Sequence, residues 1–156
     1  MVDLQQKQME QIMPTTTKPV MVIGAGVAGI QASLDLAKAG VPVILVERKG
    51  SIGGTMAALD KTFPTLDCSI CIEAPLMNDV MNNPNIEVKT LTEVQKIEGE
   101  AGDFQVTLFE KQRYVTDACT RCNLCTDACP QTTLNEFDEG LAERTANPSS
   151  NSLRVV

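Results

Sequence analysis

The six cysteines of the chain are its most reactive side chains, and four of them lie close together in the sequence. Cys119, Cys122, Cys125 and Cys129 follow the pattern C-x2-C-x2-C-x3-C-P, and the sequence DCSIC around residue 68 holds a separate C-x2-C pair. Spacings of two residues let successive thiolates surround one metal centre. None of the 156 residues is a histidine, which excludes every site that needs an imidazole ligand or base.

The four-cysteine run predicts a [4Fe–4S] cluster, because bacterial ferredoxins bind this cluster with the same spacing. Zinc is the alternative, since C-x2-C pairs also suit a tetrahedral zinc site. In two-cluster ferredoxins the last cysteine of such a run binds the other cluster. Cys129 therefore either completes the cluster of its own run or serves one built with residues from elsewhere.

Three interpretations of the upstream pair, Cys68 and Cys71, remain open. The two thiolates could bind a second [4Fe–4S] cluster that residues outside the motif complete. They could instead form a redox-active dithiol, or pack in the core as small apolar side chains.

A glycine-rich turn is the second feature that could do chemistry. GAGVAG at 24–29 matches G-x-G-x-x-G between an apolar strand predicted at 19–24 and a helix predicted at 27–40. Gly24 allows the tight turn, Gly26 lets the backbone approach a pyrophosphate, and Gly29 lets the helix pack closely on the sheet. Glu47 ends the next predicted strand, 41–47, where an acid accepts hydrogen bonds from a ribose hydroxyl. The motif predicts a dinucleotide site, and a plain packed βαβ turn is the alternative.

The loop after Glu47 favours FAD over NAD. RKGSIGG carries the paired glycines Gly53 and Gly54 and resembles the FAD domain of two-dinucleotide-binding flavoproteins. That resemblance implies a second close approach of the backbone to the diphosphate and an adenine contact near Val94. A flexible loop is the alternative for GSIGG alone. The candidate nucleotide-binding residues are Gly24, Gly26, Val27, Ala28, Gly29, Glu47, Arg48, Gly53, Gly54, Thr55 and Val94.

The remaining elements predict an α/β fold: a Rossmann-like FAD-binding βαβ unit with a β-hairpin, followed by a ferredoxin-like [4Fe–4S] segment. A short helix is expected at 71–81, although Pro75 weakens it, and strands at 86–100 and 103–115 form the hairpin. The predicted division is an arm at 1–18, the FAD-binding domain at 19–115, the cluster motif at 116–135 and a polar tail at 136–156. Residues 2–13 form either a short helix or a mobile arm.

Composition narrows the class of protein. The formal net charge of −7 argues against binding nucleic acid or anionic lipid. No run approaches the roughly 20 apolar residues that span a bilayer. The first nineteen residues lack the apolar segment of a signal peptide, so we expect a cytoplasmic protein whose cysteines are thiols or metal ligands.

Together these motifs resemble the A-type subunit of heterodisulfide reductase. The resemblance rests on VIGAGVAGIQASLDLA, VERKGSIGG, LDKTFPTLDCSICI, NPNIEV, CTRCNLCTDACP and NEFDEG, and it covers roughly residues 19–144. It implies FAD, several [4Fe–4S] clusters and assembly with subunits B and C. It also implies an electron-donating hydrogenase or formate dehydrogenase, and a flavin that bifurcates electron pairs between heterodisulfide and ferredoxin. Family members are several times longer, so the chain is expected to be a fragment or one piece of a split protein.

The expected function is therefore electron transfer between FAD and [4Fe–4S] clusters within a heterodisulfide reductase-like complex, an oxidoreductase that does not act alone. A flavin exchanges electrons in pairs and a cubane cluster passes them singly, so the two cofactors belong together. The alternatives are a non-catalytic iron–sulfur scaffold with a vestigial nucleotide fold, and an independent NAD(P)H-dependent flavoprotein reductase.

Overall fold

A parallel three-stranded sheet is the centre of the structure. The computed structural model describes residues 18–115, 118–120, 122–135 and 140–146, so the possible helix at 2–13 lies outside the described residues. The strands are β1 (Val20–Ile23), β2 (Val43–Val46) and β3 (Ile86–Lys89), in the order β1-β2-β3 with all pairs parallel. This confirms the predicted α/β class.

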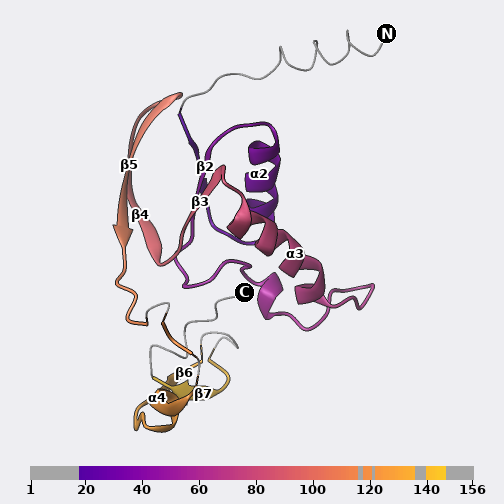
Figure 1. Ribbon diagram of the computed structural model, residues 1–156, viewed down its shortest axis with the longest axis vertical. Helices are drawn as coiled ribbons and strands as arrows, with labels where there is room; N and C mark the ends of the chain where they lie inside the picture. The colour runs from indigo at the N-terminus through magenta and orange to yellow at the C-terminus, as the bar shows by residue number, and fades with distance from the viewer. Residues whose placement is uncertain (1–17, 116–117, 121, 136–139, 147–156) are drawn as a thin grey trace.

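Two helices connect these strands and cover one face of the sheet (Figure 1). Helix α2 (Val27–Lys38) joins β1 to β2, and α3 (Ser69–Asn82) joins β2 to β3. The described residues thus make two βαβ crossovers, one more than the sequence predicted. Ala39 and Gly40 end α2, where Gly40 has φ 78°.

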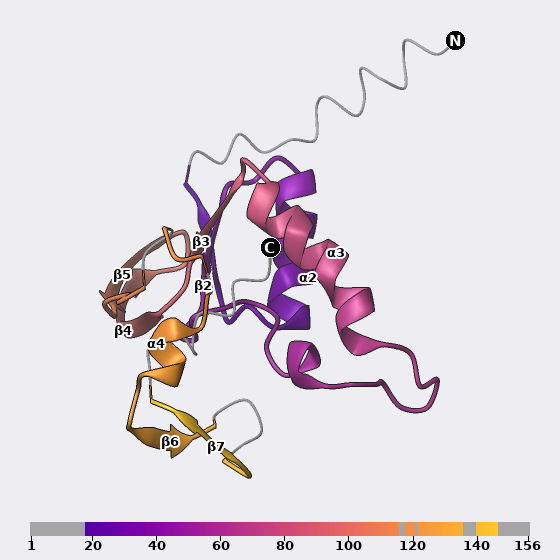
Figure 2. The same cartoon turned by 60° about the horizontal axis from the view of Figure 1, so that its bottom comes forward.

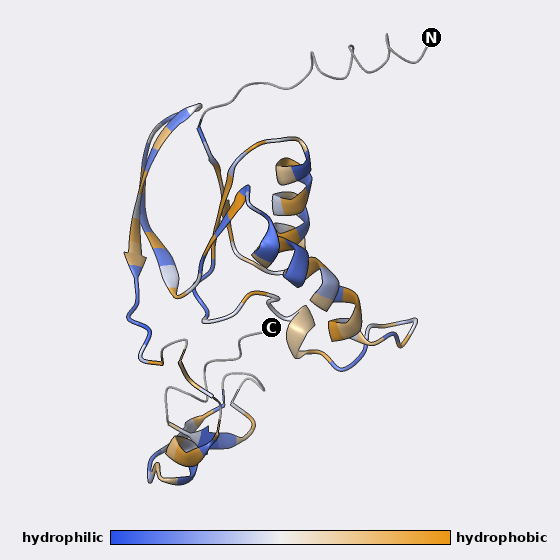
Figure 3. Cartoon of the chain, in the orientation of Figure 1, coloured by the Kyte–Doolittle hydropathy of each residue, from blue (hydrophilic) through white to orange (hydrophobic). Residues whose placement is uncertain are grey.

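The core lies between the sheet and these helices. Strands VMVI and VILV are rich in β-branched residues, which suit parallel strands covered by helices. Side chains from both layers are excluded from solvent: Ile30, Leu34, Val43, Leu45, Met77 and Val80. Figure 3 shows apolar residues along the sheet and on the helices beside it.

The segment predicted as one strand at 86–100 is two strands in different sheets. β3 ends at Lys89, and Leu91, with φ 55°, redirects the chain into β4 (Thr92–Glu100). β4 pairs antiparallel with β5 (Asp103–Glu110), which ends five residues before the predicted boundary. Alternating side chains extend across the bend, so the pattern alone could not locate it. The hairpin lies on the side of the sheet away from the helices (Figures 1 and 2).

Helix α3 is longer than predicted and continues through Pro75. Proline in a helix interior removes one backbone hydrogen bond, here the one that the carbonyl of Cys71 would otherwise accept. Burial of the apolar side chains of Met77 and Val80 against the core compensates for this loss.

The remaining described elements are short. The 3₁₀ turn η1 (Met56–Ala58) packs on α3. Helix α4 (Leu124–Asp127) and strands β6 (Thr132–Leu134) and β7 (Glu143–Thr145) form the C-terminal part. β7 pairs with β6, so residues 143–145 of the polar tail predicted at 136–156 form a β-strand. No helix within the described ranges is long and apolar enough to cross a membrane.

Glu73 is a charged group placed in the core. Its side chain is fully buried, and neither carboxylate oxygen has a hydrogen-bond partner among the described residues. Burial raises the pKa of Glu73 above its ordinary value of 4.5, because the charged form is poorly solvated there. The folded state therefore holds the proton more tightly than the unfolded state.

We predict that Glu73→Gln stabilises the fold near neutral pH. A raised pKa in the folded state means that stability decreases as pH rises from about 4.5 towards the folded-state pKa. Glutamine keeps the shape without the charge, so its melting temperature should exceed that of the natural chain at pH 7, and the difference should shrink as pH falls. Thermal unfolding of both proteins between pH 4 and 8 measures this. An equal melting temperature for the two proteins at every pH would show that the carboxylate is solvated.

Candidate dinucleotide site

The glycine turn is a bare helix N-terminus facing open space. Gly24 leaves β1 with φ 97°, a conformation that favours glycine, and Gly26 is the N-cap of α2. No side chain of the described residues caps α2, and its first turn holds no acidic residue. A Cβ atom added at Gly24 or Gly26 would meet nothing within 4 Å. The first amides of α2 can therefore receive an anion.

Gly29 sets the distance between the helix and the turn. A Cβ atom at this position would lie 1.9 Å from the carbonyl oxygen of Gly24. Only glycine permits this contact, which brings the N-terminal end of α2 against the end of β1. The role predicted for the third glycine of the motif, close packing of the helix, agrees with this geometry.

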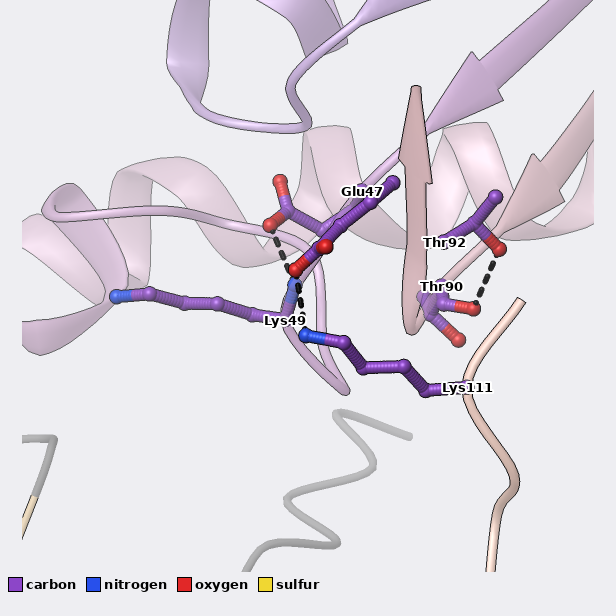
Figure 4. A network of polar contacts seen from close by, with 6 residues as sticks. Glu47, Lys49, Thr90, Thr92 and Lys111 are labelled. Carbon is purple, nitrogen blue, oxygen red and sulfur yellow. Dashed lines mark hydrogen bonds and ion pairs between the residues drawn. The ribbon is translucent and has the colours of Figure 1, made fainter. Parts of the chain in front are cut away.

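Glu47 holds the turn against the end of β2. Its Oε2 accepts the backbone N–H of Ala25 and its Oε1 accepts the backbone N–H of Lys49, each at 2.8 Å. The residue is 8 % exposed. Figure 4 shows the carboxylate of Glu47 joined to the backbone N–H of Lys49. A carboxylate oxygen has more than one lone pair, so Glu47 can accept a ribose hydroxyl as well.

The paired glycines close over the same turn. The N–H of Gly53 donates to the carbonyl of Ala25 at 2.7 Å. A Cβ atom on Gly54 would lie 2.9 Å from Cα of Gly26, so the two loops touch. Gly53 and Gly54 have φ values of 109° and 58°, which glycine adopts readily. The structure thus brings together the glycine motif, the acid and the second glycine loop.

The other predicted nucleotide-binding residues surround this centre. Val27 and Ala28 lie exposed in the first turn of α2, Arg48 is exposed after Glu47, and Thr55 precedes η1. Val94 is half-buried in β4, beside a register shift in the hairpin. Their contacts with a nucleotide stay predictions.

Sequence reasoning missed two residues that assemble the site. Ala25 is fully buried and its peptide groups bind both Glu47 and Gly53. Arg113 donates through Nη2 to Gly50 O at 3.2 Å and to Thr90 Oγ1 at 2.7 Å, joining the end of the hairpin to the loops after β2 and β3. The presence of a small residue inside the glycine motif was a sequence signal for the role of Ala25. Nothing in the sequence indicated the role of Arg113.

The residues of the turn fit FAD. The open space above Gly24 and Gly26 leaves room for a diphosphate, the uncapped α2 supplies N–H donors, and Glu47 supplies an acceptor for a ribose. These groups would hold the nucleotide, and the isoalloxazine of a bound flavin supplies two-electron chemistry.

The four-cysteine run is not gathered into a metal site. Cys119, Cys122 and Cys125 are exposed, Cys129 is half-buried, and all four carry thiols. Cys125 lies in α4, which begins after Asn123 in a left-handed conformation with φ 62°. Within the described part of the chain, no three potential ligands are close enough to hold a metal ion. The donor set suits an iron–sulfur cluster, and its assembly stays a prediction from spacing.

Cys68 and Cys71 are joined by a disulfide at the start of α3. This form offers no thiolate to a metal. Neither side chain belongs to the buried core, because Cys68 is half-buried and Cys71 is exposed. A second cluster at this pair stays a prediction for its reduced form.

Comparison with protein families and solved structures defines the class. Residues 19–66 match the family described as FAD dependent oxidoreductase. The L-proline dehydrogenase from P. horikoshii is 27 % identical with a TM-score of 0.52, covering 59 % of this chain and 19 % of that one. Thioredoxin reductase from Lactococcus lactis shares the fold at 21 % identity and a TM-score of 0.50, covering 60 % of this chain and 31 % of the other. The fold and the turn are those of an FAD-dependent oxidoreductase.

Three curated relatives are much more similar in sequence to this chain than the two solved structures are. Each is named as the A-subunit of a heterodisulfide reductase or as a protein like that subunit. The second iron-sulfur A-subunit of the CoB–CoM heterodisulfide reductase of Methanopyrus kandleri is 55 % identical, over 90 % of this chain and 22 % of that protein. A protein of Archaeoglobus profundus that is like the heterodisulfide reductase A-subunit is 56 % identical, over 83 % of this chain and 19 % of that protein. The A-subunit of the H(2)/formate:CoB-CoM heterodisulfide,ferredoxin reductase of Methanococcus maripaludis is 54 % identical, over 83 % of this chain and 20 % of that protein.

The chain is accordingly a member of the family of heterodisulfide reductase A-subunits. It spans about one fifth of the length of the curated relatives that it matches.

We predict that alanine has different effects on the stability of the fold at two glycines of the same turn. Gly29→Ala places a methyl group 1.9 Å from the carbonyl oxygen of Gly24, so it should destabilise the fold by about 2–3 kcal/mol or more. Gly26→Ala has open space and φ −82°, so its stability should stay within about 1 kcal/mol of the natural chain.

FAD titration separates packing from binding in this pair of variants. The methyl group of Gly26→Ala would occupy the space through which a diphosphate approaches, so FAD affinity should fall although the fold is intact. Thermal unfolding supplies the stability of each variant. Normal FAD binding by a folded Gly26→Ala protein would contradict the assignment of the turn.

Proposed function

We propose that this chain is the dinucleotide-binding and iron–sulfur segment of an electron-transfer protein, with FAD at the glycine turn and a [4Fe–4S] cluster on Cys119, Cys122, Cys125 and Cys129. The observation that carries this proposal is the closure around Ala25, which brings Glu47 and the loop of Gly53 to an uncapped helix N-terminus. The cysteine spacing supports the cluster, as does the term iron-sulfur in the name of a relative.

The chain's own residues have separate parts in this function. The N–H groups of α2 and its positive dipole end bind the diphosphate. Glu47 orients the ribose while it keeps the turn attached to β2. Gly54 lets the second loop approach the turn, because a Cβ atom there would lie 2.9 Å from Cα of Gly26, and Gly53 leaves room for the side chains of Ala57 and Met77.

The names of the relatives support a proposal for the complex in which the chain works. Their names specify a CoB–CoM heterodisulfide, with ferredoxin, H2 or formate as further reactants. We propose that the chain works in such a complex, with proteins like subunits B and C and a hydrogenase or formate dehydrogenase as donor. In that complex it would pass electrons between FAD and [4Fe–4S] clusters during flavin-based bifurcation.

Flavin retention by Glu47→Gln tests the nucleotide site. A carboxylate accepts both backbone N–H groups, whereas glutamine turns its own NH2 group towards one of these donors. Losing a charge-assisted hydrogen bond costs roughly 1.5–3 kcal/mol, so FAD affinity should fall about 10-fold to 150-fold. The measurement is FAD titration of the chain together with its natural partners.

Glu87→Gln is the matched control for this experiment. Glu87 lies in β3 with its side chain 60 % exposed and pairs with Lys89, so its variant should bind FAD normally. Equal retention by both variants would show that Glu47 does not contact the nucleotide. Absence of flavin from the natural chain within its complex would favour the iron–sulfur scaffold instead.

Iron analysis of Cys122→Ser tests the cluster. Anaerobic reconstitution of the natural chain should give about four iron and four sulfide per cluster motif, and the variant should lose most of both, because serine is a poor ligand for this cluster. Cys71→Ser is the comparison, since it also replaces one cysteine by serine but leaves the four-cysteine run intact. Unchanged iron content and an unchanged reduced-state EPR signal in Cys122→Ser would refute the assignment.

A further inference from the structure

The disulfide between Cys68 and Cys71 has two unequal ends. Cys68 is the N-cap of α3 and is half-buried, whereas Cys71 is the third residue of the helix and is exposed. Ile70 and Ile72, on either side of Cys71, are 36 % and 47 % exposed. In Figure 3 the ribbon of the N-terminal part of α3 is coloured mostly as hydrophobic. An external thiol can therefore reach the sulfur of Cys71 more readily than that of Cys68.

The environment of Cys68 favours negative charge on its sulfur. The backbone N–H of Cys71 donates to Sγ of Cys68 at 3.3 Å. The positive end of the α3 dipole lies at the same position, and the first turn of this 14-residue helix has no acidic residue. Helix N-termini and C-x2-C motifs both stabilise thiolates. Cys68 is thus the better leaving group when the disulfide is attacked.

The pair sits in a fixed frame. Cys68 forms an antiparallel bridge with Lys61, the N–H of Ser69 donates to Asp60 O at 3.3 Å, and the N–H of Thr62 donates to Asp67 O at 2.9 Å.

Buried polar atoms lie on the inner face of α3 next to the disulfide. Ser69 and Glu73 are fully buried one helical turn apart, and the hydroxyl of Ser69 and both carboxylate oxygens of Glu73 have no partner among the described residues. Ser69 directly follows Cys68 in the sequence, and Glu73 lies two residues after Cys71. A packed core alone gives no reason for these polar groups.

We propose that Cys68–Cys71 is a redox-active disulfide that undergoes thiol–disulfide exchange with an external dithiol. This activity depends on neither the flavin nor the cluster, so it goes beyond the proposed function. It selects the dithiol among the three interpretations that the sequence left open for this pair.

The exchange has two steps. A thiolate of the dithiol attacks Sγ of Cys71, the Cys68–Cys71 bond breaks, and Cys68 leaves as a thiolate. The second thiol of the dithiol then attacks the mixed disulfide and releases Cys71. The dithiol loses two electrons and becomes a disulfide, Cys68 and Cys71 gain them, and the two protons pass to the two cysteine thiols.

The experiment follows the two cysteines in the full chain by mass spectrometry. Cleavage after Lys61 and Lys89 isolates a peptide that contains Cys68 and Cys71 and no other cysteine. The oxidised chain is exposed to glutathione as a monothiol probe, acid-quenched and digested. The adduct should lie on Cys71, because this is the predicted point of attack. Adducts found mainly on Cys68 would overturn the mechanism.

A matched pair of substitutions tests the role of the helix N-terminus. Ile70→Glu adds an acid to the first turn of α3, and Ile70→Gln changes size and polarity without the charge. Reduction by dithiothreitol should be about two- to fivefold slower in Ile70→Glu than in Ile70→Gln, since a like charge at this end disfavours the leaving thiolate. Equal rates in the two variants would contradict the role of Cys68, and far-ultraviolet circular dichroism checks that both are folded.

Two probes separate small dithiols from protein dithiols, namely dithiothreitol and reduced thioredoxin. Reduction of the disulfide in the folded chain by either probe supports the exchange and shows which kind of dithiol takes part. Reduction only after the chain is unfolded would overturn the proposal. Iron analysis gives a further check. If an anaerobically purified chain holds iron that the double variant Cys68→Ala, Cys71→Ala loses, the pair binds a metal and the exchange proposal fails.

Discussion

The buried carboxylate of Glu47 is the interaction on which the dinucleotide site depends. Its two oxygens accept N–H groups from Ala25 and Lys49, so one side chain joins the turn after β1 to the loop after β2. Excluding a charged carboxylate from water requires hydrogen bonds to its oxygens, because otherwise the group is driven to bind a proton. The same requirement that stabilises the charge therefore fixes the geometry of the phosphate-binding turn.

Much of this site could be predicted from the sequence, because its residues act through backbone geometry. A glycine is informative wherever another residue would clash, as at Gly29, or would need an unfavourable φ, as at Gly24. Glu47 was identifiable from its position after an apolar strand. The link from Arg113 to Gly50 and Thr90 was not, because it joins residues 63 and 23 positions apart and depends on how the hairpin folds back.

The fold was predictable for the first βαβ unit and less so afterwards. Apolar runs followed by a glycine turn have few alternatives, whereas the alternating segment 86–100 fits one long strand as well as two short ones. Leu91 makes the difference with a positive φ, which leucine adopts only when the surrounding structure requires it. The spacing of the four-cysteine run predicts which residues bind one metal centre. It does not predict where these side chains lie before the metal binds.

The attachment of Arg113 limits where the cysteine run can lie. Gly50 and Thr90 follow β2 and β3, so Arg113 is fixed near the carboxyl ends of the parallel strands, the edge at which such sheets bind their ligands. Cys119 comes six residues later in the sequence, and six residues of fully extended chain reach about 20 Å. The Cα atom of Cys119 therefore stays within about 20 Å of the Cα atom of Arg113, however the rest of the segment is arranged.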